Sequence, residues 1–319
     1  MESLSHDRII GIDVSRDWLD IHCLPDGQRL RLANDDGGHA IVAKLARERE
    51  AIVCFEATGG LEWKLWSVLD GADVETRQVA PAQVKAFARS LGTRAKTDRI
   101  DAELIARFLV FRPGAGRSLP AEHLRTLRAL TTKRAQMVEM RKRLLAQIRA
   151  HGKSGTAELF EGLDAELKDR LDRMIADLEN RISRLLSRDA RLTETTRILR
   201  SVPGIGPVAS STLIAELPEL GTLSGEEAAA LTGLAPIAQD SGTLRGKRAI
   251  TGGRRALRHV LFQAALVASH HTPTLKAFAD RLRKAGKPHK VIVTAVARKL
   301  VVTANALCKR RQEWVPRAT

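Results

Sequence analysis

Residues 8–33 have the sequence RIIGIDVSRDWLDIHCLPDGQRLRLA, and this stretch decides the fold of the first part of the chain. Arg8–Ile12 is short and rich in β-branched residues. Trp18–Leu24 alternates apolar and polar residues, and a Pro-Asp-Gly turn separates it from Gln28–Ala33. The stretch therefore predicts an antiparallel meander of three strands.

Helix and strand patterns alternate after the meander. Helices are predicted at Gly38–Glu50, Leu61–Leu69, Pro81–Leu91 and from a Thr97 cap to Phe111, and strands at Ala51–Phe55 and Val74–Val79. This order predicts an α/β domain over residues 1–117. It is compatible with an RNase H-like fold, although periodicity alone does not single out that fold.

The rest of the chain is predicted to be all-α. In residues 118–199, apolar residues recur at helical spacing through Ala121–Ala150 and Leu163–Arg200, with a break at His151–Gly155. Two such helices predict an antiparallel hairpin or coiled-coil arm, which we expect to drive oligomerisation. Residues 200–319 predict a mainly helical C-terminal domain interrupted by Gly-rich loops.

The net charge of +16 is distributed unevenly. Lys and Arg number 17 against 18 Asp and Glu in residues 1–117, 17 against 12 in residues 118–199, and 19 against 7 in residues 200–319. Cationic side chains release the counterions condensed on phosphates. The C-terminal segment is therefore predicted to bind nucleic acid, and a merely soluble basic surface is the alternative.

Composition excludes several classes of protein. Aromatic residues make up only 3%, which disfavours a stacking platform for single strands, and the absence of tyrosine excludes a tyrosine recombinase. Cys23, Cys54 and Cys308 fit neither a disulfide framework nor a zinc spacing. No run of about 18 apolar residues and no signal-peptide pattern is present, so we expect a cytoplasmic protein without a membrane partner.

Four carboxylates lie at the ends of predicted elements. Asp13 follows a strand in GIDVS and Glu56 follows a strand in FEATGG. Asp98 and Asp101 lie three residues apart in KTDRIDA, so they share a helix face. Mg²⁺ prefers carboxylate oxygens, and paired ions about 4 Å apart support phosphoryl transfer. The four acids therefore predict a Mg²⁺ site; for each acid, a helix cap or surface charge is the alternative.

Residues 201–207, SVPGIGP, indicate a helix-hairpin-helix. Gly204 and Gly206 would let backbone N–H groups approach a phosphate at a helix N-terminus. Such a motif binds the nucleic-acid backbone without regard to sequence. A plain Gly-rich connection between helices is the alternative.

Ser241 is predicted to lie in a flexible Gly-rich loop ringed by cations. A serine hydroxyl is a poor nucleophile unless another group accepts its proton or a metal polarises its target. No histidine lies beside Ser241, so a Ser-His-Asp hydrolase is not supported, and a structural serine is the alternative. The predicted phosphate contacts are Arg245, Lys247, Arg248, Arg254 and Arg255, with a second basic stripe, or solvated face, of Arg283, Lys284, Lys287 and Lys290.

Together these motifs resemble the transposases of bacterial insertion sequences that join a RuvC-like domain to a serine-bearing C-terminal domain, relatives of the Piv DNA invertases. The matching stretches run nearly end to end: GIDVS, FEATGG, KTDRIDA, VPGIG, and GLAP with SG and RGKRAITGGRRALR. The resemblance implies that the family's four metal-binding acids correspond to Asp13, Glu56, Asp98 and Asp101. It implies that the nucleophilic serine corresponds to Ser241.

The resemblance also implies partners. A structured guide RNA, the bridge RNA, would pair with donor and target double-stranded DNA. The enzyme would act as a homotetramer on the bacterial nucleoid, with the acids and the serine of each site drawn from different subunits.

The expected function is therefore an RNA-guided DNA transposase or recombinase that exchanges strands through a phosphoserine intermediate, with Mg²⁺ as cofactor. One alternative is a metal-dependent, structure-specific nuclease similar to a junction resolvase, in which Ser241 is structural. A non-catalytic nucleic-acid-binding scaffold is a second alternative, and the intact set of four acids argues against it.

Overall fold

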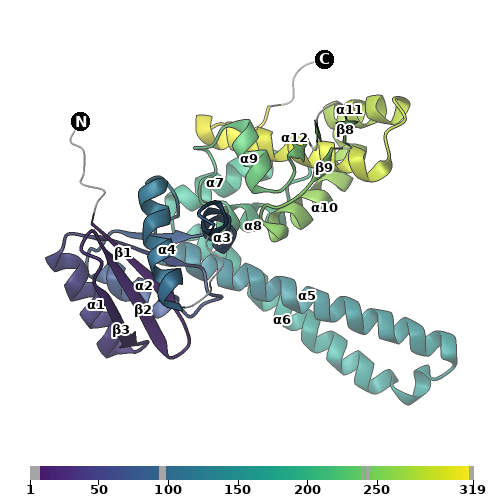
Figure 1. The fold of residues 1–319 in the computed structure, drawn as a ribbon. Coiled ribbons are helices and arrows are strands. Elements are labelled where there is room, and N and C mark those ends of the chain that lie inside the picture. Colours follow the sequence, from purple (N-terminus) through teal and green to yellow (C-terminus); the bar gives the residue numbers. More distant parts are fainter. Residues whose placement is uncertain (1–7, 93–97, 239, 242–243, 247, 316–319) are drawn as a thin grey trace. The chain divides into compact units, whose positions relative to one another are not determined.

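The computed structural model describes residues 8–92, 98–238, 240–241, 244–246 and 248–315. The chain divides into two compact units, 1–120 (unit 1) and 121–319 (unit 2) (Figure 1). Unit 1 mixes helices and strands, and unit 2 is mostly helical. The predicted α/β class is therefore confirmed for unit 1, and unit 2 is mainly helical as predicted but also contains short strands.

Unit 1 is built on one five-stranded sheet in the order β3-β2-β1-β4-β5. The strands are β1 (Ile9–Val14), β2 (Trp18–Leu24), β3 (Arg29–Ala33), β4 (Ile52–Glu56) and β5 (Thr76–Val79). β1, β2 and β3 pair antiparallel, whereas β4 lies parallel to both β1 and β5. The predicted meander is confirmed, and the strand order agrees with the expected RNase H-like fold.

Helices cover both faces of this sheet. They are α1 (Asp36–Glu48), α2 (Trp63–Gly71), α3 (Pro81–Ser90) and α4 (Asp98–Phe111). Ile10 and Ile12 pack with the residues of α1 and α2, whereas Ile9 and Cys54 pack with those of α3 and α4. Because side chains alternate along a strand, successive residues of β1 supply the two cores.

The arm of unit 2 consists of α5 (Glu122–Ser154) and α6 (Glu161–Ser187), joined through a short 3-10 turn (Figure 1). Arg134 pairs with Glu179 at 2.6 Å, and Arg141 pairs with Asp172 at 2.6 Å. The numbering rises along one helix as it falls along the other, so the helices are antiparallel. This confirms the predicted helical hairpin.

Two helix boundaries in the arm differ from the prediction. α5 continues through His151 to Ser154, and its C-cap Gly155 has a left-handed φ of 71° that favours glycine. The pattern at Leu163–Arg200 contains two helices, α6 and α7 (Ala190–Ser201). The second begins because the Asp189 side chain accepts a hydrogen bond from the Leu192 N–H and caps it.

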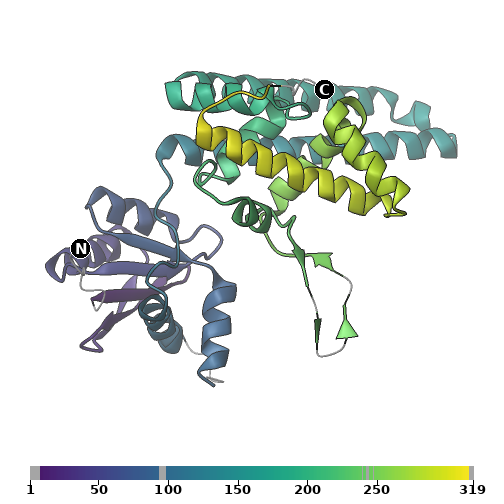
Figure 2. The same cartoon turned by 90° about the horizontal axis from the view of Figure 1, so that it is seen from above.

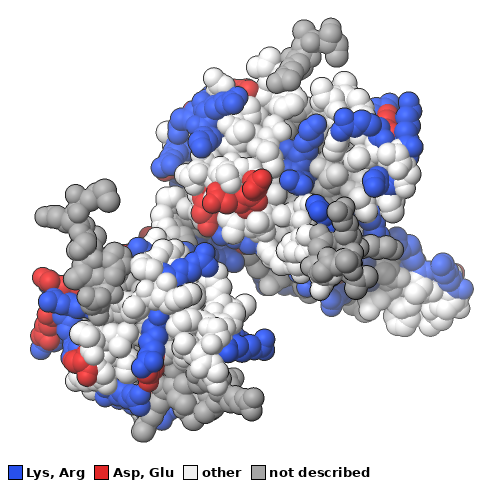
Figure 3. Space-filling view, turned by 45° about the horizontal axis from the view of Figure 1, so that its top comes forward, with Lys and Arg blue, Asp and Glu red and all other residues white. Residues whose placement is uncertain are grey.

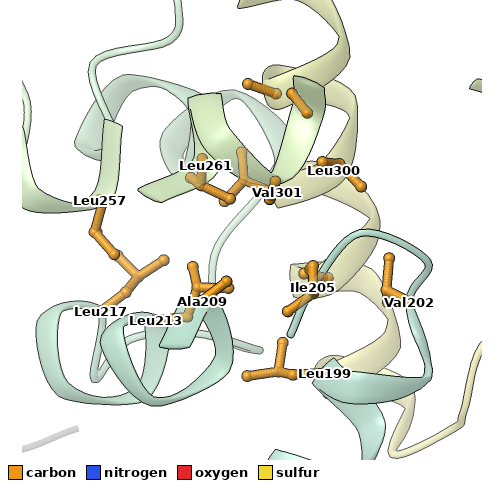
Figure 4. Close-up of a cluster of buried hydrophobic side chains, with 14 of the residues drawn as sticks. Leu199, Val202, Ile205, Ala209, Leu213, Leu217, Leu257, Leu261, Leu300 and Val301 are labelled. Carbon is orange, nitrogen blue, oxygen red and sulfur yellow. The ribbon is translucent and has the colours of Figure 1, made fainter. Parts of the chain in front are cut away.

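The other helices of unit 2 enclose one core. They are α8 (Pro207–Glu216), α9 (Gly225–Leu231), α10 (Arg255–His271), α11 (Pro273–Lys284) and α12 (His289–Arg310). Figure 4 shows Leu213, Leu261 and Val301 meeting in this core. Leu127 and Ile182, from the base of the arm, belong to the same cluster. The arm was expected to be a separate domain over 118–199, but it belongs to the same compact unit as residues 200–319.

α12 is a central helix of this core. Among the described residues, it is the helix whose length and apolar composition would allow a membrane crossing, and 44% of its most apolar window is buried. Val296, Leu300 and Val301 are each almost fully buried in the core cluster. Its apolar character is accounted for by packing inside unit 2.

A narrow ribbon, the serine hairpin (the described residues of 236–250), projects from the helices of unit 2 (Figure 2). β6 (Pro236–Ile237) pairs with β9 (Ala249–Ile250), and β7 (Asp240–Ser241) pairs with β8 (Leu244–Arg245). Ser241 was predicted in a flexible loop, but it lies on a short strand. Strand pairing had no clear sequence signal because each ladder spans only two residues.

Candidate active site

Asp13 and Glu56 stand at the carboxyl ends of adjacent parallel strands. Ile12 of β1 lies beside Phe55 of β4, so the next residues along both strands are the two acids. Residues in register on parallel strands project from the same face of a sheet. That face carries Ile9 and Cys54, and it is covered by α3 and α4. Both acids are partly exposed, so they remain accessible.

α4 brings Asp101 to the same face. A Cβ atom added to Gly11 would lie 2.3 Å from the carbonyl oxygen of Ala102, so α4 touches β1 at this point. Asp13 lies two residues beyond Gly11 on the same face, and Asp101 directly precedes Ala102. Asp98 is the first residue of α4, and its side chain lies outside the described part of the chain.

A buried carboxylate organises the loop that follows Glu56. Glu62 is only 2% exposed. It accepts hydrogen bonds from the Thr58 hydroxyl (2.8 Å), the Gly60 N–H (2.9 Å) and the Gln78 side-chain amide (2.8 Å). Gln78 in turn accepts a hydrogen bond from Arg117 at 2.7 Å. This network fixes the turn after β4, a role for Glu62 that the sequence analysis missed.

Asp20 is a further acid on the face of the sheet that carries Asp13 and Glu56, and the sequence analysis did not identify it. It pairs in register with Asp13 across β1 and β2, is 5% exposed and lies 3.6 Å from Arg31. His22, opposite Gly11, is also buried, and burial lowers the pKa of its imidazole. The alternation of Trp18–Leu24 places Asp20 and His22 on the polar face of the strand, and it gives no sign that a helix buries that face.

The donor atoms at this edge of the sheet suit Mg²⁺. Asp13, Glu56 and Asp101 offer only carboxylate oxygens, the ligands that hard cations prefer. Among the side chains that the structure describes, no three acids, histidines or cysteines gather closely enough to hold one ion. Asp98, the fourth predicted ligand, is not among those side chains. The described acids therefore fit Mg²⁺ by donor type, although the described side chains alone do not complete a site.

Ser241 lies exposed on the serine hairpin, far along the chain from the four acids. The hairpin leaves the helices of unit 2 where the backbone segments at Gly233 and Gly253 cross. A Cβ atom on Gly253 would lie 2.1 Å from the Gly233 nitrogen, and both glycines have a φ near +66°. Arg258 donates a hydrogen bond to the Gly252 carbonyl at 2.7 Å and braces this crossing.

The predicted basic residues fall into distinct environments. Arg248, Arg255 and Lys290 line one cavity of unit 2. Lys284 and Lys287 are exposed, and Arg283 pairs with Asp280. Lys247 and the side chain of Arg245 lie outside the described residues. Figure 3 shows that Lys and Arg side chains are spread over the visible face of unit 2.

Arg254 has a structural environment. Its guanidinium donates two hydrogen bonds to the Glu219 carboxylate, at 2.8 and 2.6 Å, and one to the Glu216 carbonyl at 2.6 Å. Such a bidentate pair is among the stronger polar contacts in proteins. We therefore expect Arg254 to hold the base of the serine hairpin rather than to reach a phosphate.

The two glycines of the predicted helix-hairpin-helix differ in environment. Gly204 has a φ of 96°, and a Cβ atom there would lie 2.8 Å from the Ala268 Cβ, so it permits close packing against α10. Gly206 is exposed at the N-cap of α8, with open space around it. α7 and α8 do flank this turn, while phosphate binding by it stays a prediction.

Comparisons with known proteins identify relatives of both units. Residues 10–153 match the IS110 DEDD model, described as a transposase, and residues 196–280 match a model described as "Transposase IS116/IS110/IS902 family". The pilin gene-inverting protein of Moraxella bovis is 29% identical over 270 residues, which cover 81% of this chain and 80% of the relative.

Two further similarities were found. An uncharacterised 44.8 kDa protein of insertion element IS116 from Streptomyces clavuligerus is 24% identical over 98% of both chains. Among solved structures, RuvC of T. thermophilus in complex with a Holliday junction substrate aligns with a TM-score of 0.26 and 17% identity. That alignment covers 36% of this chain and all of the other.

Proposed function

This chain belongs to the IS116/IS110/IS902 family of transposases and is a DNA-recombining enzyme, and we propose that it cuts and rejoins DNA strands through a covalent bond to Ser241. The acids of unit 1 and the serine of unit 2 would form one active site when nucleic acid assembles them. Neither unit holds a complete site in this proposal.

The observation that carries the proposal is the shared face of Asp13, Glu56 and Asp101. Two adjacent strand ends and the first turn of α4 place acids from three distant segments on one face of the sheet. Ser241 adds an exposed hydroxyl in a strongly basic segment.

Asp13, Glu56, Asp98 and Asp101 would hold Mg²⁺. When bound, this ion supplies positive charge that stabilises the phosphate oxygens and the departing oxygen during phosphoryl transfer. The partly exposed carboxylates of Asp13 and Glu56 leave room for a DNA phosphate at the edge of the sheet.

The reaction at Ser241 is a transesterification. The hydroxyl loses its proton to a base or to water, and Oγ forms a bond to the scissile phosphorus. The bond from phosphorus to one deoxyribose oxygen breaks, and that oxygen takes up a proton. One phosphodiester replaces another, so rejoining needs no nucleotide cofactor. Lys and Arg side chains near the hairpin would stabilise the charge on the phosphate oxygens.

Substrate and assembly complete the proposal. The name of the Moraxella relative describes inversion of a gene segment, which supports double-stranded donor and target DNA as substrates here. We further propose that a bridge RNA selects the sites and that the enzyme works as a tetramer on the bacterial nucleoid. The exposed apolar residues along the arm support self-association.

The test is to trap the covalent intermediate. Purified protein is incubated with labelled donor DNA, guide RNA and Mg²⁺, and then denatured with detergent. The native chain is expected to give a protein–DNA band that protease removes, and Ser241→Ala is expected to give none while still binding RNA. Ser211→Ala is the matched control, because its buried hydroxyl bonds the Val208 carbonyl at 3.1 Å.

The rival is a metal-dependent nuclease that leaves free DNA ends. Cleavage by Ser241→Ala at the native rate, with no adduct in the native protein, would establish that rival and overturn the proposal. Asp13→Asn and Asp101→Asn should abolish cleavage under both mechanisms, so only the adduct separates them.

A further inference from the structure

Unit 2 contains an open cavity of about 980 Å³ at the base of the serine hairpin, here called the hairpin groove. Its walls come from α10, α11 and α12, together with Pro236 of β6 and Ile250 of β9. Within the described residues the groove therefore joins the helical core to the ribbon that carries Ser241.

Charge in the groove has one sign. Arg248, Arg255, Arg258, Lys290, Arg298 and Lys299 line it, and none of the described lining residues is acidic. Three of these cations, Arg258, Arg298 and Lys299, were not among the phosphate contacts predicted from the sequence. A concentration of cations without counter-charges favours a polyanion over a neutral protein segment.

The groove also has an apolar lining. Leu234, Phe262 and Phe278 contribute to it, and Phe278 is approached by the Lys299 ammonium at 4.4 Å from the ring centroid. At its edges Ile250 is 38% exposed and Val291 is 50% exposed. A duplex backbone presents only sugars and phosphates, and it would leave this apolar surface unused. The face of an unstacked base would cover it.

The groove is close to Ser241 along the chain. Pro236 of β6 lines the groove and is five residues before Ser241, and an extended chain advances at most about 3.6 Å per residue. Ser241 therefore lies within about 18 Å of Pro236. Stacked nucleotides rise about 3.4 Å each along one strand. A DNA strand bonded to Ser241 would have its groove-bound nucleotide within roughly five positions of the cut.

We propose that the hairpin groove binds one unpaired nucleotide of the DNA strand that Ser241 cleaves. The base packs on the apolar lining, and the cations bind the phosphates on either side. This inference rests on the proposed function of Ser241. The scarcity of aromatic residues is consistent with it, since a site for one base needs far fewer aromatic side chains than a platform for several.

The test is equilibrium binding by the full chain carrying Ser241→Ala, so that no covalent capture occurs. Two labelled DNA duplexes are compared, identical except for one extrahelical nucleotide near the cleavage position. The protein is expected to prefer the bulged duplex by about tenfold, within the range typical of stacking one base on a protein.

Two substitutions examine the apolar lining and one examines the charge. Ile250→Asn and Val291→Asn should each remove the preference without changing affinity for the paired duplex, because they alter no charge. Val267→Asn is the matched control: Val267 is 53% exposed on α10 and lies outside the groove. Arg298→Ala should weaken binding of both duplexes. It should also reduce the slope of the logarithm of the binding constant against the logarithm of salt concentration by about one, because one fewer counterion is released.

The inference is overturned if the bulged and paired duplexes bind equally, or if Val267→Asn removes the preference as Val291→Asn does. Tighter binding of an RNA bulge than of the DNA bulge overturns DNA as the occupant. Failure here is distinct from failure of the proposed function. If the native protein forms the Ser241 adduct but the Ser241→Ala protein shows no preference for the bulged duplex, only the proposal for the groove is refuted.

Discussion

Gly11 determines how closely α4 approaches the sheet. A methyl group there would lie 2.3 Å from the Ala102 carbonyl oxygen, which belongs to backbone that cannot rotate away. We expect Gly11→Ala to lower the free energy of unfolding by about 1–3 kcal/mol. Cleavage should fall by roughly a hundredfold, because Asp101 shifts with α4. Urea denaturation and a cleavage assay measure the two effects.

Gly152→Ala is the control for this substitution. Gly152 lies inside α5, and a Cβ atom there meets nothing within 4 Å. Alanine should raise stability by about 0.5–1 kcal/mol and leave cleavage unchanged. An equal loss of cleavage in both variants would contradict the role assigned to Gly11.

His39 makes the stability of unit 1 sensitive to acid. Burial lowers the pKa of its imidazole. Nε2 lies 2.7 Å from the Asn34 side-chain oxygen, which can only accept, so Nε2 carries the proton. Nδ1 is buried without a hydrogen-bond partner among the described residues. Protonating Nδ1 in the folded protein is therefore costly.

The unfolded chain binds this proton near pH 6.5, whereas the folded chain binds it only at lower pH. The free energy of unfolding should therefore be highest above pH 6.5 and decrease as the pH falls from 6.5 toward the folded pKa. Urea midpoints at pH 7.5 and 5.0 measure this decrease. His39→Gln should reduce the difference between them, and an undiminished difference would contradict the prediction.

The strand patterns placed Asp13 and Glu56 near the carboxyl ends of two strands, as the structure has them, while their role as metal ligands stays a prediction. The contacts of Glu62 and Arg254 had no sequence signal, because a buried hydrogen-bond network or a partly buried ion pair depends on contacts between distant segments. Arg254 and Arg258 have the same side chain four residues apart, yet only the structure shows that one is paired with Glu219 and the other braces the glycine crossing.

At the scale of elements, the arm leaves apolar side chains exposed. On α6, Leu163, Leu167 and Met174 are 58%, 43% and 41% exposed. We expect the double substitution Leu163→Asp and Leu167→Asp to lower the assembled mass toward the 35.0 kDa of one chain. Introduced charges would repel across a shared interface. Light scattering gives the mass.

Glu166→Gln, at an exposed polar position of the same helix, serves as the control and should keep the native mass. An unchanged mass in the doubly substituted protein would show that the arm does not mediate self-association.

Helix periodicity located the arm but misjudged where its helices end. The apolar spacing continues across Asp189, so the pattern predicted one helix where there are two. The side chain of Asp189 caps the first turn of α7, and so a new helix begins there. Leu199 of α7 then packs in the core of unit 2. The predicted boundary between residues 199 and 200 does not separate two compact units. Periodicity cannot show that side chains at the base of the arm pack in the same core as residues of the C-terminal segment.

At the scale of the whole molecule, the acids and Ser241 belong to different compact units. If each active site combines units from two subunits, inactive variants should complement each other. We expect a mixture of Asp13→Asn and Ser241→Ala proteins to recover cleavage, since some sites receive intact acids from one subunit and Ser241 from another. Mixing during refolding or co-expression, followed by the adduct assay, measures the recovery.

Each variant alone should remain inactive, and a chain carrying both substitutions should complement neither. Absence of recovery in a mixture shown to contain mixed oligomers would mean that both parts of a site come from the same subunit.

The crossing of Gly233 and Gly253 has a consequence for how this enzyme can diversify. The chain leaves the helical body close to the point where it returns, although Leu234 still packs in the core. Residues of the ribbon beyond the groove can therefore change without disturbing the packing of α10 and α12. We expect sequence change to be tolerated there, except at Ser241, and rejected at the two glycines, so the outer ribbon is a natural position for engineering new strand specificities.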